Sequence, residues 1–213
     1  MKKKILVACL CVALAVLTIA GTTLAYLTSQ DKVVNTFTVG NVQIKLDEAK
    51  ANADGTLVAN ADRVKANSYK LIPGHTYTKD PMVTVLSGSE SSYIKMTVTF
   101  SKAAELDAIF APNGADMTSI FNGYDSTNWN YKGNTENATA NTRTYEFWYK
   151  EAVAAPTTDV ALDALFDSIT VPGTITSTQL ETIKGMTITV NAYAIQADGF
   201  ATPEAAWAAY AAA

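Results

Sequence analysis

Apolar and polar residues alternate along several stretches of the chain, and this period of two predicts β-strands. The clearest stretch is Tyr93–Ser101, in which Ile94, Met96, Val98 and Phe100 share one parity and Lys95, Thr97 and Thr99 share the other. One apolar and one polar face are typical of a strand in an antiparallel sheet. Similar alternation predicts strands in Asn35–Leu46, Met82–Val85, Thr142–Lys150 and Thr187–Gln196.

The predicted strand Asn35–Leu46 changes phase at Gly40-Asn41, which leaves open a β-bulge or a tight turn between two short strands. Asp54-Gly55 and Pro73-Gly74 are typical turn sequences. The polar, alanine-rich residues 47–67 are expected to form a loop or a weak helix. Residues 122–141, rich in Asn, Gly and Thr, predict a long surface loop.

Short helices are predicted at four places. Ala103–Phe110 and Ala161–Phe166 have helical character, and Thr178 with Glu181 fits a capping box for a helix that closes at Gly185. Thr202-Pro203 begins a terminal helix with proline at its first position, and Phe200, Trp207 and Tyr210 form its expected packing side. Many strands, few helices and no alternating βαβ order predict an antiparallel β-sandwich.

The first residues have the pattern of a secretion signal. Three lysines at 2–4 precede an apolar run from Ile5 to Ala20, and Thr23 and Ala25 supply small residues before a cleavage point. We therefore expect residues 1–25 to be a signal peptide cut between Ala25 and Tyr26. A retained membrane anchor is the alternative, because the run up to Leu27 is about 20 apolar residues long.

Cleavage would change the composition of the chain. Cys9 and Cys11, its two cysteines, lie inside the predicted signal, so the mature chain would contain no disulfide. It would keep 13 of the 16 basic residues against all 20 acidic ones, a net charge of −7. This charge argues against nucleic acid as a partner. The sequence leaves open whether lysine–asparagine isopeptide bonds replace the missing disulfides.

The residues indicate no catalytic centre. His75 is the one histidine, so a zinc site with two histidines one helical turn apart is excluded, and a lone histidine in a turn is ordinary surface chemistry. Residues 50–61 resemble a calcium loop, but Lys50 and Ala61 stand where carboxylates belong. An irregular calcium site from Asp47, Glu48, Asp54 or Asp62 stays open; solvated loop charge is the simpler interpretation. We expect no catalytic residue, cofactor or metal.

Aromatic residues have two interpretations. Trp129 and Tyr131, in the predicted polar loop, have the composition of a surface that stacks on sugar rings, which makes them candidate glycan contacts. Packing in the core is the other interpretation. It suits Tyr145, Phe147 and Tyr149, which share one parity of a predicted strand.

Several motifs together resemble the TasA/camelysin family of exported Gram-positive proteins. These are Ala25-Tyr26-Leu27-Thr28, Asn35-Thr36-Phe37-Thr38-Val39-Gly40-Asn41-Val42, Pro73-Gly74 with Lys79-Asp80-Pro81, and the stretch Ala192–Phe200 followed by Trp207. Residues 103–170 match only in general character. Leu27-Thr28-Ser29 stands where family members commonly have Phe-Thr-Asp.

The resemblance implies a jelly-roll-like β-sandwich over residues 40–213, cleavage by a SipW-type signal peptidase, and a secreted or cell-surface subunit of biofilm matrix fibres. It implies self-association, with an accessory assembly protein as a further partner. Residues 26–39 would be an exposed segment that adds a strand to the next subunit, with Leu27, Val33 and Val34 as its apolar residues. A fold-back of this segment onto its own subunit, or disorder, is the alternative. The family also implies a camelysin-type protease as an alternative function, which the single histidine does not support.

Overall fold

The computed structural model describes residues 40–110 and 121–212, which belong to one compact unit, Gly40–Ala213. The predicted signal peptide, its cleavage site at Ala25 and Tyr26, and the segment with Leu27, Val33 and Val34 lie outside the described residues. The description below therefore concerns the body of the protein.

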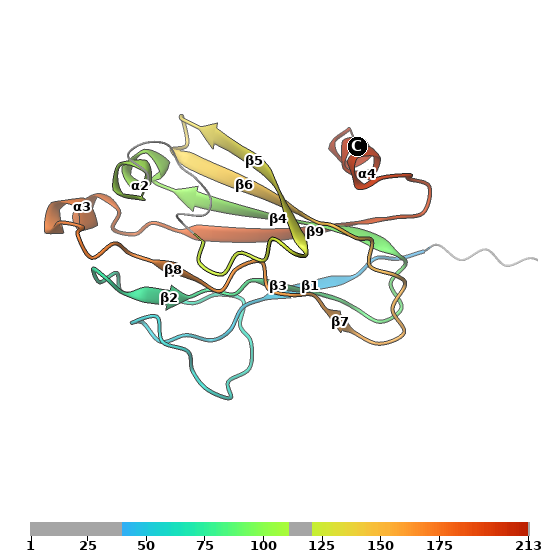
Figure 1. The fold of residues 1–213 in the computed structure, drawn as a ribbon, viewed down its shortest axis with the longest axis horizontal. Helices are drawn as coiled ribbons and strands as arrows, with labels where there is room; N and C mark the ends of the chain where they lie inside the picture. The colour runs from blue at the N-terminus through green and yellow to red at the C-terminus, as the bar shows by residue number, and fades with distance from the viewer. Residues whose placement is uncertain (1–39, 111–120, 213) are drawn as a thin grey trace, which may run out of the picture. The chain divides into compact units, whose positions relative to one another are not determined.

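One layer of the body is a four-stranded antiparallel sheet in the order β5-β6-β4-β9 (Figure 1). Its strands are β4 (Ser92–Ser101), β5 (Trp129–Asn137), β6 (Thr142–Tyr149) and β9 (Ile188–Gln196). The long strand β4 lies in the middle and pairs with β6 on one side and β9 on the other. Among the described strands, the sheet therefore ends at β5 on one edge and at β9 on the other.

Shorter strands form the opposite layer (Figure 1). Strands β1 (Ile44–Asp47), β3 (Met82–Val85) and β7 (Val160–Ala161) pair in the order β1-β3-β7. Strand β2 (Thr76–Thr78) pairs with β8 (Ser168–Thr170). All described strand pairs are antiparallel, so the protein is a mostly β structure of antiparallel sheets with three short described helices.

The main core lies between the two layers, because the apolar side chains of each layer point toward the other layer. Ile94, Met96 and Val98 of β4 are fully buried, and Val83 and Val85 of β3 face them in the same cluster. The polar residues between them on β4 are partly exposed. The alternation predicted for this strand is therefore confirmed, as are the predicted strands at 82–85, 142–150 and 187–196.

The described helices lie at the ends of the strands. Helix α2 (Ala103–Phe110) follows β4, and α4 (Pro203–Ala211) begins at the N-cap Thr202 with proline in its first turn, both as predicted. Helix α3 (Ser177–Thr182) begins two residues earlier than predicted. Its capping box joins Thr176 and Gln179 in place of Thr178 and Glu181, because Thr-x-x-Gln offers the same pair of reciprocal hydrogen bonds.

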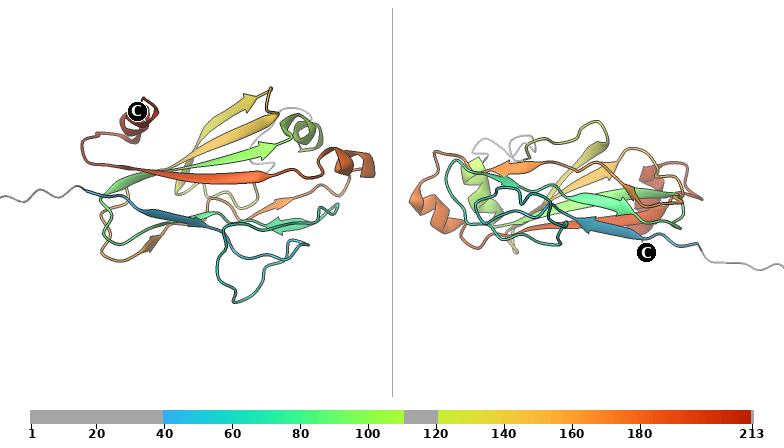
Figure 2. Two further views of the ribbon diagram at one scale, coloured as in Figure 1. Left: turned by 180° about the vertical axis from the view of Figure 1, so that it is seen from behind. Right: turned by 90° about the horizontal axis from the view of Figure 1, so that it is seen from below.

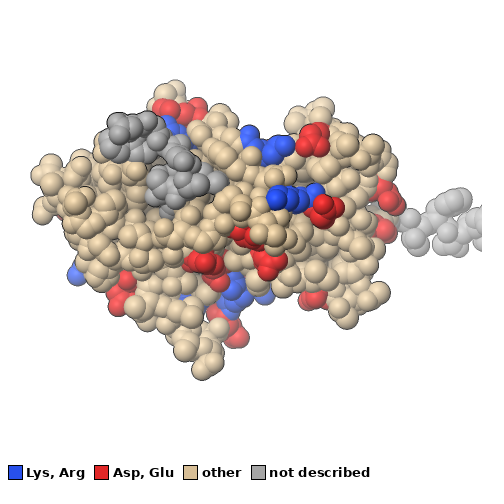
Figure 3. Space-filling view, viewed as in Figure 1, with Lys and Arg blue, Asp and Glu red and all other residues tan. Residues whose placement is uncertain are grey.

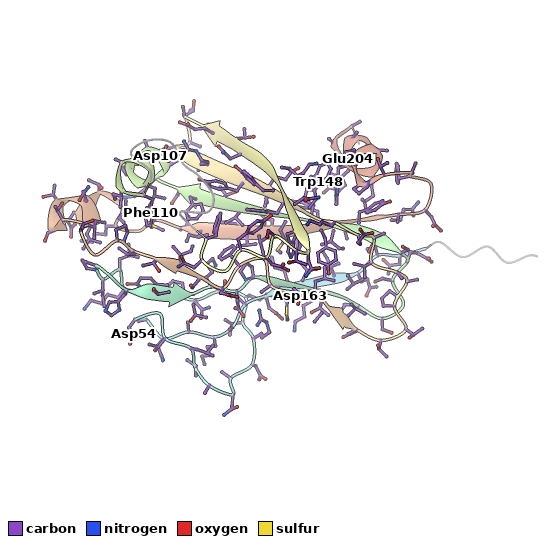
Figure 4. The ribbon with its side chains drawn as sticks, viewed as in Figure 1. Asp54, Asp107, Phe110, Trp148, Asp163 and Glu204 are labelled. Carbon is purple, nitrogen blue, oxygen red and sulfur yellow. The ribbon has the colours of Figure 1, made fainter. Side chains whose placement is uncertain are left out.

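Helix α4 covers part of the outer face of the four-stranded sheet, where a second apolar cluster forms. Trp207 and Ala206 of the helix are buried against Tyr93, with Trp148 and Tyr193 packed beside them. Figure 4 shows Trp148 close to α4, which carries Glu204. The predicted packing side of the terminal helix is therefore confirmed for Trp207 and Phe200. Tyr210 is 43% exposed, although its ring packs against those of Trp207 and Tyr193.

Two predictions of local structure are wrong. The predicted loop 122–141 contains strand β5, which pairs with β6 and has a register shift between Tyr131 and Gly133. An edge strand with one solvated face needs few apolar residues, so its composition resembled that of a loop. The predicted helix Ala161–Phe166 is irregular chain beyond β7, because the N–H groups of Leu162 and Leu165 bond to carbonyls at Val83 and Pro81.

Other predictions fall partly on the described chain. Of the predicted strand Asn35–Leu46, the described part forms a strand only from Ile44. Residues 47–67 form a loop closed by two isolated β-bridges, and the turns at Asp54-Gly55 and Pro73-Gly74 are present. Within the described part, none of the helices has the length and apolar character needed to cross a membrane.

Candidate functional site

Trp129 is not available to a sugar. It begins β5, its side chain is 1% exposed, and its indole N–H donates to the carbonyl of Asp163 at 3.2 Å. Of the two interpretations of Trp129, packing in the core is confirmed and glycan contact is not, because the apolar side of β5 turns the ring into the core.

Tyr131, the other candidate glycan contact, is half-buried on the same strand. Its ring packs at 5.5 Å from the ring of Phe147, and its hydroxyl accepts a hydrogen bond from the side chain of Asn134 at 2.9 Å. Trp129 is therefore a core residue, and Tyr131 lies at the edge of the core. The two rings do not form an exposed aromatic surface together.

Three of the four carboxylates named for a calcium site, those of Asp47, Glu48 and Asp54, have partners in the protein, and Asp62 is exposed. Asp47 bonds to Arg63 and Lys45, and Glu48 bonds to Lys79, with all three distances at 2.6 Å. Asp54 accepts hydrogen bonds from Thr56 within its own turn, and His75 is exposed in the turn that follows Pro73-Gly74. Among residues 40–110 and 121–212, three or more His, Cys, Asp or Glu side chains do not gather in a metal-binding arrangement.

The open edge of β9 is the most distinctive surface of the described body. Within the described chain, β9 pairs with β4 alone, and its other side has no partner strand. In register with β4, the N–H of Ser101 donates to the carbonyl of Thr187, and the N–H of Ala197 donates to the carbonyl of Ser91. Antiparallel pairs alternate, so the backbone groups of the even-numbered residues, 188 to 194, point to the open side.

The same even-numbered residues point their side chains into the core. Ile188, Val190, Ala192 and Ala194 pack against the main cluster, yet all four are only partly buried. The equivalent residues of the neighbouring strand β4 are fully buried. The residues that the structure describes therefore cover the core incompletely along β9, where apolar side chains and unpaired backbone groups occur together.

A groove runs beside this edge. It consists of two adjoining hollows of about 410 Å³ and 390 Å³, which share Asn67, Lys79 and Ile188, and we call it the β9 groove. Apolar side chains of both layers line it, among them Leu46, Leu71, Val171, Met186 and Val190. Figure 2 shows β9 and β1 along the same side of the body.

Strand β1, across the groove, has a protected edge. Beyond its end, Glu48 exchanges two backbone hydrogen bonds with Val64. The ammonium group of Lys65 donates to the carbonyl of Leu46 at 2.5 Å. A lysine and a paired loop are common ways to prevent edge-to-edge pairing, so among the described strands β9 has the free edge on this side.

Charged side chains order the loop that borders the groove. The guanidinium of Arg63 bonds to the carboxylates of Asp47 and Asp80. Burial of Asp47 opposes its ionisation, but hydrogen bonds from Lys45 and Arg63 outweigh that effect and lower its pKa. The loop 47–67 is therefore tied to β1 and to the residues before β3.

Sequence reasoning did not find the groove or the buried pair Glu48–Lys79. The pattern of β9 predicted a strand but could not show that it lies at an edge, because strand order depends on long-range pairing. Lys79 stood in a motif of the family resemblance without an assigned role. A buried lysine and a buried glutamate 31 positions apart gave no local signal.

Comparisons with models of known protein families, with curated proteins and with solved structures found no match. The functional interpretation therefore depends on the residues and on the geometry described above.

Proposed function

We propose that the chain is a secreted structural subunit of extracellular or biofilm matrix fibres, which assembles by strand addition. The acceptor in this proposal is the open edge of β9 with the β9 groove. The donor is the predicted segment Tyr26–Asn35 of another subunit, freed by signal cleavage. The fold expected with this function is a jelly-roll-like sandwich.

One observation carries the proposal: within the described chain, the even-numbered residues 188 to 194 of β9 have both unpaired backbone groups and partly exposed core side chains. An added strand would pair with these backbone groups and cover the apolar side chains in one step. Single exposed apolar residues are normal on a protein surface, whereas an apolar row beside an unpaired edge favours strand binding.

The donor and acceptor have compatible lengths and chemistry. Tyr26–Asn35 is ten residues long and β9 is nine. Leu27 and Val33, which share one parity, would supply apolar side chains for the groove, and Gln30 and Lys32, which share the other parity, would face solvent. Figure 3 shows acidic and basic side chains interspersed on the face of the body seen in the view of Figure 1.

Electron microscopy of three forms tests the acceptor and the donor separately. The mature chain from Tyr26 should form filaments, and a form that lacks Tyr26 to Val34 should not. The variant Ala192→Pro should also fail, because proline removes the N–H that points to the open side and leaves the hydrogen bonds with β4 intact. Ala192→Ser keeps that N–H and is the matched control, which should assemble.

The outcomes separate the parts of the proposal. Filaments from the truncated form would refute the donor segment, and filaments from Ala192→Pro would refute β9 as the acceptor. A mature chain that remains monomeric at high concentration, with and without extracts of the producing cells, would refute the fibre function. Neither alternative function is proposed, because Trp129 is buried and no observation favours proteolysis.

A further inference from the structure

Three side chains with complementary chemistry meet at the border of the β9 groove. The ammonium group of Lys79 donates to Oε2 of Glu48 at 2.6 Å, and both residues are 6% exposed. The amide nitrogen of Asn67 donates to Oε1 of the same carboxylate at 3.0 Å. One buried glutamate therefore bridges an amine and a primary carboxamide.

The carboxamide of Asn67 is polarised by the backbone. Its oxygen accepts a hydrogen bond from the N–H of Ala51 at 2.9 Å, and its nitrogen also donates to the carbonyl of Ala49 at 2.8 Å. A backbone N–H aimed at a carbonyl oxygen stabilises the negative charge that develops there during nucleophilic attack. The arrangement thus contains an amine, a proton-transferring group and an oxyanion donor.

We propose that Lys79 and Asn67 become joined by an intramolecular isopeptide bond, with Glu48 as the general acid and base. Attack requires Nζ of Lys79 to move from the carboxylate to Cγ of Asn67. Both side chains line the two hollows of the β9 groove, which gives the lysine terminus room for this movement and the product ammonia a route to solvent.

The reaction balances without an external reagent. Glu48 takes a proton from the Lys79 ammonium, and the neutral amine attacks Cγ of Asn67 to form a C–N bond, with the negative charge on Oδ1. Glu48 returns its proton to Nδ2, and the Cγ–Nδ2 bond breaks. The departing ammonia takes the remaining proton from the new amide nitrogen and leaves as ammonium, so Glu48 ends ionised and no redox change occurs.

Such a bond would be a covalent cross-link between residues 67 and 79, in a body that has no disulfide. The described residues contain no cysteine, since both cysteines lie at positions 9 and 11. Positions 67 and 79 frame the turn at Pro73-Gly74 and strand β2, so the bond would fasten the loop 47–67 to the chain that enters β3. A covalent link of this kind stabilises chiefly by restricting the unfolded chain.

Mass spectrometry of the folded mature chain tests the proposal, whether or not filaments form. The bond removes one ammonia, so the intact mass should be about 17 Da below the sequence mass. Trypsin cleaves after Lys65, Lys70 and Lys95 but not after a modified Lys79. The digest should therefore contain residues 66–70 joined to residues 71–95.

Variants assign the roles. Lys79→Arg keeps the positive charge beside Glu48 but lacks the nucleophilic amine, and it should show the full sequence mass. Glu48→Gln should also show the full mass, whereas Glu90→Gln, at an exposed position, should retain the loss. If a variant does not fold, the wild-type digest alone decides: free peptides 66–70 and 71–79 and an unreduced mass would overturn the proposal.

Discussion

The ammonium group of Lys95 lies 4.6 Å from the centroid of the Trp207 ring, which joins the outer face of β4 to helix α4. The rings of Tyr193 and Tyr210 lie 5.5 Å and 5.4 Å from the same nitrogen. The Lys95 side chain is 13% exposed and has one carboxylate nearby, Glu146 at 3.7 Å. Aromatic faces therefore supply much of its favourable electrostatic environment.

The variant Lys95→Met tests this contact. Methionine keeps an unbranched apolar stem but removes the charge, so we expect a loss of about 1–2 kcal/mol in the free energy of unfolding. Urea denaturation followed by tryptophan fluorescence measures it. Lys184→Met, which removes an exposed ion pair with Glu181, is the control and should change stability by less than about 0.5 kcal/mol. Equal effects of the two substitutions would contradict the aromatic contact.

In a monomeric form that lacks Tyr26 to Val34, proline at two adjacent positions of β9 should lower the free energy of unfolding by clearly different amounts. The N–H of Asn191 points toward β4 in the ladder, and the N–H of Ala192 points to the open side. Asn191→Pro should therefore lose a ladder bond and destabilise by about 2–3 kcal/mol, whereas Ala192→Pro should cost about 1 kcal/mol or less. Thermal and urea unfolding provide the comparison. A larger loss at Ala192 would show that the assigned alternation of β9 is wrong.

Trp129→Ala should affect stability rather than surface recognition. The substitution removes a fully buried ring and its hydrogen bond to Asp163, so we expect a loss of about 3–5 kcal/mol. Tyr131→Ala, at a half-buried position of the same strand, should cost less. Chemical denaturation of both variants tests the order, and a Trp129→Ala protein as stable as the wild type would contradict the buried position.

Asp47 should contribute to the acid sensitivity of the protein. Its pKa is lowered in the folded state, so its stabilising effect is fully present above the ordinary value near 3.8 and is lost as the pH falls through the lowered value. Asp47→Asn should destabilise by about 1–3 kcal/mol at neutral pH, and the difference from wild type should shrink below about pH 4. Urea titrations at a series of pH values from about 2.5 to about 7, which include the ordinary carboxyl pKa, provide the test.

The control for that series is Asp198→Asn, which removes an exposed carboxylate from the turn before α4. It should leave the free energy of unfolding within about 0.5 kcal/mol of wild type at neutral pH. A difference between Asp47→Asn and wild type that stays constant down to the lowest pH would argue against an ionised, stabilising Asp47.

Gly55 and Gly199 form a matched pair, since both have φ of +92°. A Cβ at Gly55 would lie 2.6 Å from the carbonyl oxygen of Thr76 and 2.7 Å from Cα of Tyr77, whereas a Cβ at Gly199 would meet nothing within 4 Å. Gly199→Ala should therefore cost about 1–2 kcal/mol from backbone strain alone. Gly55→Ala should cost about 1–3 kcal/mol more, because backbone atoms must move. Similar unfolding midpoints for the two variants would contradict the close approach of Gly55 to β2.

Local pattern predicted most of the regular elements, and its failures have clear causes. Leu162, Leu165 and Phe166 are spaced as on a helix and are all buried, but their chain bonds to the residues around β3. Apolar spacing reports burial, and burial alone does not distinguish a helix from an irregular segment in the core. Strand β5 was not predicted from its composition, because its pairing with β6 is what makes it a strand.

The sequence alone determined the parity of β4, β6 and β9, the helices α2 and α4, and the turns at Gly55 and Gly74, because these depend on neighbours within a few residues. Tertiary structure decided that β9 lies at an open edge, that Trp129 is buried, and that Glu48 joins Lys79 to Asn67. These properties arise from contacts between segments far apart in the chain. Such contacts depend on how the two layers pack and which strands pair, and no local pattern contains that information.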